Sequence, residues 1–167
     1  MASIKKAYGS ATDLTITLAS LATDSNLLTG RESTAVDNTS NLYMDYILSG
    51  FITTGTSPTA DTEIRIYLYY SIDDTPTYPD VFDGTDSAET VSNVYIRDTG
   101  LIPVHSIFVG STSDVTYPIP AIGLAQFFGG EIPKYFGVFI THETGVNLNA
   151  TSGNHQITVT PVYETVA

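Results

Sequence analysis

The chain of 167 residues contains no cysteine and no tryptophan, and only six of its residues are Lys or Arg. Without cysteine there is no disulfide scaffold, no thiolate zinc site and no cysteine nucleophile, so stability must come from a core or from assembly. No run of 18 apolar residues occurs, which excludes a membrane-spanning helix. Two lysines near the start have no apolar segment behind them, so we expect no secretory signal there.

The scarcity of cations leaves the chain strongly acidic. Eighteen Asp and Glu residues oppose six Lys and Arg, which gives a net charge of -12 and a pI near 4.2. A field of this sign repels phosphate backbones and anionic membrane surfaces. We therefore expect no nucleic-acid or membrane partner, and consider proteins, glycans and cations instead.

Hydrophobic and hydroxyl side chains are abundant. Hydrophobic residues make up 42% of the chain, which is enough for the core of one domain of this length. There are 25 Thr, 15 Ser and 11 Tyr residues. Thr and Tyr favour β-strands, so the composition indicates an all-β protein.

Apolar and polar residues alternate along most of the chain, as is typical of half-buried strands. In residues 63–71 the alternation places Ile64, Ile66 and Leu68 on one face. No segment has the period of an amphipathic helix. We expect strands at residues 13–18, 42–53, 63–71, 91–97, 101–109, 115–119, 135–142 and 156–163, separated by turns that contain glycine.

About eight antiparallel strands of unequal length predict a β-sandwich of the jelly-roll type, which closes two sheets over one core. An immunoglobulin-like sandwich is the alternative, although the buried Trp that marks it is absent, and a less specific all-β domain is the third. We expect a single sandwich domain over residues 13–167. An N-terminal arm, residues 1–12, lacks strand alternation and precedes it.

Motifs for catalysis are missing. There is no GxSxG elbow, SxxK motif or phosphate-binding glycine loop, and no HxH or HExxH spacing joins His105, His142 and His155. The carboxylates that could form a glycosidase pair are Asp45, Glu63 and Glu131. Arg65 is a plausible neighbour of Asp45, and we interpret that pair as a surface ion pair. The sequence predicts a protein that is not an enzyme and has no cofactor.

Residues 72–89 form a long acidic loop that contains proline. A loop of this length without its own secondary structure is often functional. Asp80, Asp83 and Asp86 are candidate calcium ligands, because hard cations prefer oxygen. The spacing is not that of an EF-hand, and an acidic, solvated loop is the alternative interpretation that we favour.

Two surfaces are candidates for an interface. Tyr67 and Tyr69 lie on the outward side of the predicted strand at 63–71, with Tyr43 nearby, and aromatic residues are typical of interface cores. A strand that is buried on both faces explains the same tyrosines equally well. In the arm, Lys5, Lys6 and Tyr8 could reach an acidic neighbour.

Two stretches carry a resemblance to a known group of proteins. They are TGRESTAVDNTSNLYMDY at residues 29–46 and ITTGTSPTADTEIRIYLYYS at residues 52–71. Residues 18–71 resemble small structural proteins of tailed bacteriophages, and the remaining residues are similar to them in expected architecture only. The stretches contain no catalytic residues, and no functional residue carries over from these proteins.

The resemblance implies a virion component, foremost a decoration (cement) protein on the outer capsid. Its partners would be the major capsid protein or other virion proteins and further copies of itself, for example in a trimer. It would be made in the host cytoplasm and reside on the capsid surface. The alternative is a glycan-binding or receptor-binding module of a phage tail or fibre.

Overall fold

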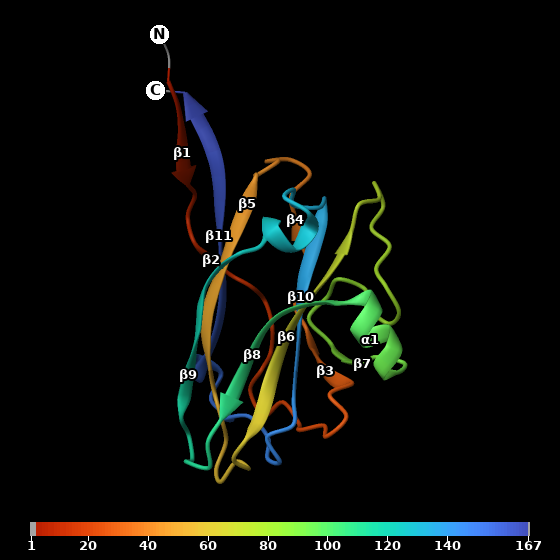
Figure 1. The fold of residues 1–167 in the computed structure, drawn as a ribbon, viewed down its shortest axis with the longest axis vertical. Helices are drawn as coiled ribbons and strands as arrows, with labels where there is room; N and C mark the ends of the chain where they lie inside the picture. Colours follow the sequence, from red (N-terminus) through yellow and green to blue (C-terminus); the bar gives the residue numbers. More distant parts are fainter. Residues whose placement is uncertain (1–2, 167) are drawn as a thin grey trace.

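The computed structural model describes residues 3–166, which form two antiparallel β-sheets packed face to face (Figure 1). Sheet A contains β1 (Ile4–Tyr8), β2 (Thr12–Asp13), β5 (Asp45–Thr53), β9 (Thr116–Gly123) and β11 (His155–Val166). Sheet B contains β3 (Thr29–Glu32), β4 (Val36–Asp37), β6 (Thr62–Ser71), β7 (Ala88–Thr90), β8 (Ile102–Val109) and β10 (Tyr135–His142). The predicted all-β sandwich is confirmed.

The pairing of the strands is that of a jelly roll. The chain behaves as one long hairpin, because β6 pairs with β8, β5 with β9, β3 with β10 and β2 with β11, all antiparallel. The hairpin is then rolled up, so that β5 also pairs with β11 and β6 with β10. The result is an order of β2-β11-β5-β9 in sheet A and β3-β10-β6-β8 in sheet B, with β1, β4 and β7 added at the edges.

The main core lies between the sheets and follows the alternation of the strands. From sheet A it receives Leu48, Ile52 and Ile157, and from sheet B it receives alternate residues of β6 and β10. Each fully buried aliphatic side chain of this size contributes about 1.5–3 kcal/mol relative to its exposed state. The residues of β6 and β10 that face this core are Ile64, Ile66, Leu68, Phe136, Val138 and Ile140.

The segment between β6 and β8, residues 72–101, forms an insertion over the outer face of sheet B. It contains β7, which extends the sheet beside β3, and helix α1 (Val94–Gly100). A second cluster fills the space below the insertion, and its members are Tyr67, Tyr69, Phe82, Val91, Leu101 and Phe139. Tyr67 is 3% exposed and Tyr69 0%, so the prediction that they present an outer interface is wrong. The strand is buried on both faces, because the insertion covers it.

The strand predicted at residues 91–97 is also wrong, because α1 occupies most of this range. The Asn93 side chain accepts a hydrogen bond from the Ile96 amide and caps the helix. Arg97 points inward and donates to the carbonyl oxygens of Asn26 and Leu27 at 2.8 and 3.4 Å. Contacts with residues about 70 positions away therefore fix a helix that the local β-branched composition did not predict.

Burial alternates along residues 13–18 as predicted, but most of this segment does not pair as a β-strand. Only Thr12–Asp13 pairs as a strand; beyond it, the Leu14 amide donates to Ile157 in sheet A, whereas the Thr15 carbonyl accepts from Thr34 next to sheet B. The segment therefore crosses from one sheet to the other. Conversely, the predicted arm contains a strand, β1, that its lack of alternation did not predict.

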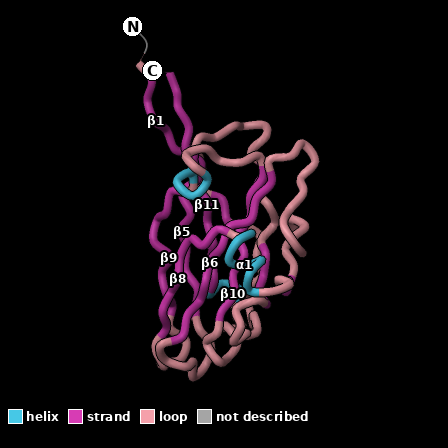
Figure 2. The backbone as a smooth tube through the Cα atoms, turned by 45° about the vertical axis from the view of Figure 1, so that its right-hand side comes forward, coloured by secondary structure: helices cyan, strands magenta, loops and turns pink. Residues whose placement is uncertain are grey.

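The molecule has two different ends (Figures 1 and 2). At one end β1 and the last residues of β11 extend past the sandwich as a two-stranded ribbon, beside the loops at residues 38–44 and 124–134. We call this the ribbon end. The opposite end consists of the loops at residues 54–61, 110–115 and 143–154. Within residues 3–166, no helix has the length and apolar character needed to cross a membrane.

Candidate interaction surfaces

The ribbon joins the two ends of the chain. Ile4 lies opposite Val166 and Tyr8 opposite Val162, in a continuous antiparallel register. Ile4, Tyr8 and Val166 are 69%, 61% and 71% exposed. An isolated two-stranded ribbon is marginally stable in water, so apolar residues along it are suited to contact a partner.

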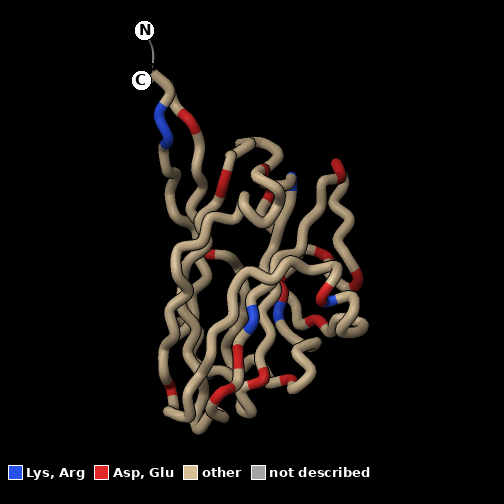
Figure 3. Tube along the Cα trace, in the orientation of Figure 1, with Lys and Arg blue, Asp and Glu red and all other residues tan. Residues whose placement is uncertain are grey.

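The two lysines of the ribbon differ in their ion pairing from the other lysine and the arginines of the chain. Arg31, Arg65, Arg97 and Lys134 each form an ion pair, with Asp86, Glu63, Asp98 and Asp74 respectively. Lys5 and Lys6 are exposed and have no ion-pair partner within residues 3–166, although Lys6 lies opposite Glu164 in the ladder. In Figure 3 the two lysines are the blue segment on the ribbon. The predicted interface residues Lys5, Lys6 and Tyr8 are thus all available.

Other exposed apolar residues gather at the same end. Ten large hydrophobic side chains are exposed within residues 3–166, and seven belong to the ribbon or the adjacent strand ends and loops: Ile4, Tyr8, Leu42, Met44, Tyr70, Ile72 and Val166. A hollow of about 480 Å³ lies between Tyr70, Ile72 and Phe128, and another of about 350 Å³ contains Leu42 and Met44. Exposed apolar surface of this kind marks interaction sites.

We expected Tyr43 beside Tyr67 and Tyr69, but it lies at the base of the ribbon. Its half-buried ring packs edge-on against Tyr46 and tilted against Tyr163, with centroids 5.6 and 5.7 Å apart. Tyr46 is buried, and burial raises its pKa to about 12. Tyr43 also lines a groove of about 500 Å³ that contains Asp13.

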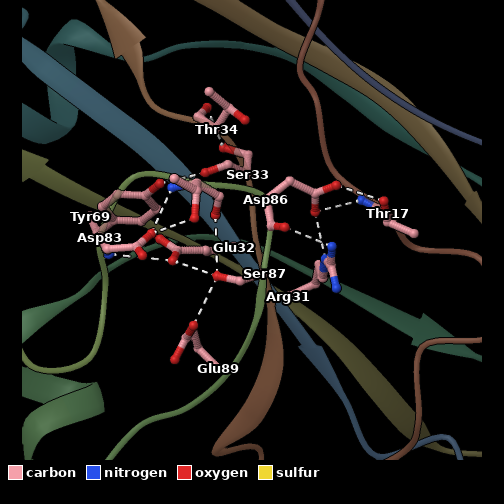
Figure 4. A network of polar contacts seen from close by, with 11 residues as sticks. Thr17, Arg31, Glu32, Ser33, Thr34, Tyr69, Asp83, Asp86, Ser87 and Glu89 are labelled. Atoms are coloured by element: carbon pink, nitrogen blue, oxygen red, sulfur yellow. Dashed lines mark hydrogen bonds and ion pairs between the residues drawn. The ribbon is translucent and has the colours of Figure 1, made fainter.

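A buried carboxyl group holds the insertion against sheet B (Figure 4). Glu32, which is 0% exposed, accepts hydrogen bonds from the amides of Asp83 and Gly84 at 3.3 and 3.4 Å and from the Ser87 hydroxyl at 3.0 Å. Burial raises the pKa of Glu32, although these donors oppose the shift. The same hydroxyl lies 2.8 Å from Glu89, so it bridges two acidic groups.

Asp86 makes a second connection a short distance along the loop. Arg31 donates to it from Nε at 2.5 Å, and Thr17 donates from its amide at 3.0 Å and from its hydroxyl at 2.6 Å. Burial alone would raise the pKa of Asp86, but the hydrogen bonds from Arg31 and Thr17 hold it below its usual value. The carboxylate therefore joins the insertion, β3 and the crossing segment.

The structure does not bring the three calcium candidates together. Asp80 accepts from the amide and hydroxyl of Ser92, and Asp83 accepts from those of Thr85, whereas Asp86 binds Arg31. Each carboxylate thus has its own protein donors. The described residues contain no group of three or more His, Asp or Glu side chains placed to hold a metal ion.

The other candidate carboxylates are also apart. Asp45 lies in sheet A and accepts from the amides of Tyr46 and Ala125, whereas Arg65 lies in sheet B and pairs with Glu63. The proposed Asp45–Arg65 pair is therefore wrong, because the two residues lie in different sheets. Glu131 is exposed at the ribbon end.

Two of the histidines are structural. His142 is fully buried between the Thr144 hydroxyl and the Leu21 carbonyl, each 3.0 Å away, and burial lowers its pKa to about 4. His155 lies 2.8 Å from the Asn149 carbonyl, and burial lowers its pKa also. His105 is half-buried on β8.

No protein-family model, curated protein or solved structure matches the chain. The sequence predicted Lys5, Lys6 and Tyr8 as interface residues; the structure exposes all three, and their part in an interface stays a prediction. Sequence reasoning missed Leu42, Met44 and Ile72, because a single exposed apolar residue has no signal in the sequence. It also missed Glu32, whose burial depends on the insertion.

Proposed function

We propose that the protein is a structural component of a tailed-bacteriophage particle, a decoration protein that binds the assembled head through its ribbon end. The observation that carries the proposal is the gathering of seven exposed hydrophobic side chains at one end of a chain with a net charge of -12. The resemblance of residues 18–71 to phage structural proteins supports it.

The physical requirements of this role agree with the molecule. Attachment needs contact area and shape, and a protein that binds only the assembled shell stabilises the shell by mass action. The acidic body would repel the packaged genome and other finished particles. The jelly roll is an architecture that viral capsid proteins use, but lectins and other proteins use it too, so the fold alone does not carry the proposal.

The test uses heads of the encoding phage assembled without this chain. The purified protein is added, the heads are sedimented, and bound copies are counted by quantitative gel or mass spectrometry. We expect saturable binding with a fixed number of copies per head. An unsaturable or absent signal contradicts the proposal.

A matched pair of variants locates the attachment surface. Ile72 is 66% exposed beside the hollow at the ribbon end, and Phe108 is 72% exposed on β8 away from it. Ile72→Ser should weaken head binding about tenfold, the loss of one well-packed apolar contact. Phe108→Ser should bind as the unmodified protein does. Equal effects of the two substitutions would place attachment elsewhere.

The second candidate function is a glycan-binding module of a phage tail or fibre. The groove beside the ribbon favours it, because Asn41, Tyr43 and Asp13 combine an aromatic ring with polar groups. Ligand pockets of this size with few polar groups are common. A glycan array probed with and without a chelator tests this candidate, and no binding in either condition removes it.

A further inference from the structure

Hydrogen bonds fix the loop at residues 38–44 in a conformation that exposes its apolar side chains to solvent. Asn38 is 3% exposed, and its side chain donates to the Tyr43 carbonyl at 3.1 Å and accepts from the Tyr43 amide at 2.9 Å. The Leu42 amide donates to the Asn38 carbonyl at 3.0 Å. These bonds leave Leu42 and Met44 72% and 53% exposed. Because internal hydrogen bonds order this turn and its exposed side chains are apolar, the turn is preorganised to bind a partner.

One charge lies among these apolar residues. The hollow of about 350 Å³ that contains Leu42 and Met44 is closed on its other side by Gly130, Glu131 and Ile132. Glu131 is exposed and forms no ion pair within residues 3–166. The hollow therefore fits a ligand that is apolar and positively charged.

The ribbon has this chemistry. Lys5 and Lys6 are the only two lysines or arginines without an ion-pair partner in the described chain. Lys6 shares its face of the ribbon with Ile4, Tyr8 and Val166 and lies opposite Glu164, whereas Lys5 lies on the other face. Only the base of the ribbon is near this loop in the same copy, where Val162 lies opposite Tyr8 and accepts from the Met44 amide. The rest of the ribbon extends past the loops (Figures 1 and 2), so it is placed to meet the hollow of another copy.

We propose that the ribbon of one copy docks in the hollow of a second copy, with Lys6 against Glu131 and with Ile4 and Tyr8, which share the face of Lys6 on β1, against Leu42 and Met44. Contact between two different surfaces generates a ring where the rotation between copies closes. Sedimentation of the purified protein tests this contact without a virus particle, and the hollow lined by Tyr70 and Ile72, which the contact does not use, stays free for attachment to heads.

Charge reversal tests the contact. The molar mass of the purified protein is measured by sedimentation equilibrium over a range of concentrations, for the unmodified protein and three variants: K6E, E131K, and both substitutions together. We expect the unmodified protein to associate, each one-sided reversal to weaken association at least about tenfold, and the combined variant to recover most of the loss.

The control has the same change in charge at the opposite end. Glu143→Lys shifts the net charge as E131K does, but it lies on the loop at residues 143–154, so it should leave association unchanged. Thermal unfolding of every variant confirms that it folds. A monomer at all concentrations overturns the proposal, as does a combined variant that is no better than the one-sided reversals, or E143K acting like E131K.

Discussion

Gly137 and Tyr69 are opposite each other on β10 and β6, and the missing side chain of the glycine makes room for the phenol ring. The ring stacks on Phe82 at a centroid distance of 4.9 Å, and its hydroxyl donates to the Ser33 carbonyl at 2.6 Å. Single residues of this kind connect the sheet to the insertion that covers it. Alternation in the sequence predicted the direction of Tyr69 but could not predict what covers it.

Substituting Gly137 should therefore be costly. In Gly137→Ala the new Cβ would overlap the Tyr69 ring, which cannot move because Phe82 and Ser33 hold it. We expect a loss of about 1–3 kcal/mol in the free energy of unfolding, the usual cost of overpacking, measured by urea denaturation. Gly153→Ala is the control, since nothing lies within 4 Å of its Cβ position. A G137A variant as stable as G153A would contradict this view of the packing.

His142 should make stability depend on pH. Its pKa falls from 6.5 to about 4 on folding, because burial disfavours the charged ring. The stabilisation is complete above pH 6.5 and is lost as the pH falls toward 4, by about 3 kcal/mol over this window. His155 acts in the same direction, whereas Glu32, with a raised pKa, opposes them.

Urea denaturation at a series of pH values measures this dependence. The Asp residues with lowered pKa values lose their contribution to stability as the pH falls through and below 3.8, which lies below this window. We expect His142→Gln to make the free energy of unfolding less dependent on pH, and His105→Gln to leave this dependence as steep as in the unmodified protein. A His142→Gln profile as steep as that of the unmodified protein would show that the buried ring does not resist protonation.

At the scale of elements, the best predictions came from strands that face the main core. The strand expected at residues 135–142 is Tyr135–His142, and the one expected at 63–71 is Thr62–Ser71. Every second side chain of each strand enters the main core, and this period of two is the signal that the sequence carries. The strand expected at 91–97 failed because α1 depends on its Asn93 cap and on Arg97, whose partners lie about 70 residues away.

The attachment of the insertion to sheet B should depend on Asp86. Asp86→Asn removes the charge that Arg31 and Thr17 bind, which should cost about 1.5–3 kcal/mol. We expect faster hydrogen exchange across residues 72–101 with little change in β5 or β11. Asp73→Asn is the control in the same loop, because its exposed carboxylate has no hydrogen bond within residues 3–166. Equal exchange in the two variants would mean that Asp86 does not hold the insertion.

The whole molecule is a rolled hairpin with two unlike ends. The rolling brings the loop after β4, the loop after β9, the end of β6 and the ribbon of β1 with the last residues of β11 to one end of the molecule. These segments are far apart in the sequence, so only the charged arm of the candidate site could be predicted before folding. The gathering of Leu42, Met44 and Ile72 follows from the topology and not from any local pattern.

The most direct test of the central claim is an electron cryomicroscopy map of the assembled phage particle. If this chain grips a larger assembly through its ribbon end, the map will contain the jelly roll with the ribbon and the loops at residues 38–44 and 124–134 facing the shell, and the loops at 54–61, 110–115 and 143–154 facing solvent. Particles without this chain, or with the ribbon end pointing into solvent, would contradict the account.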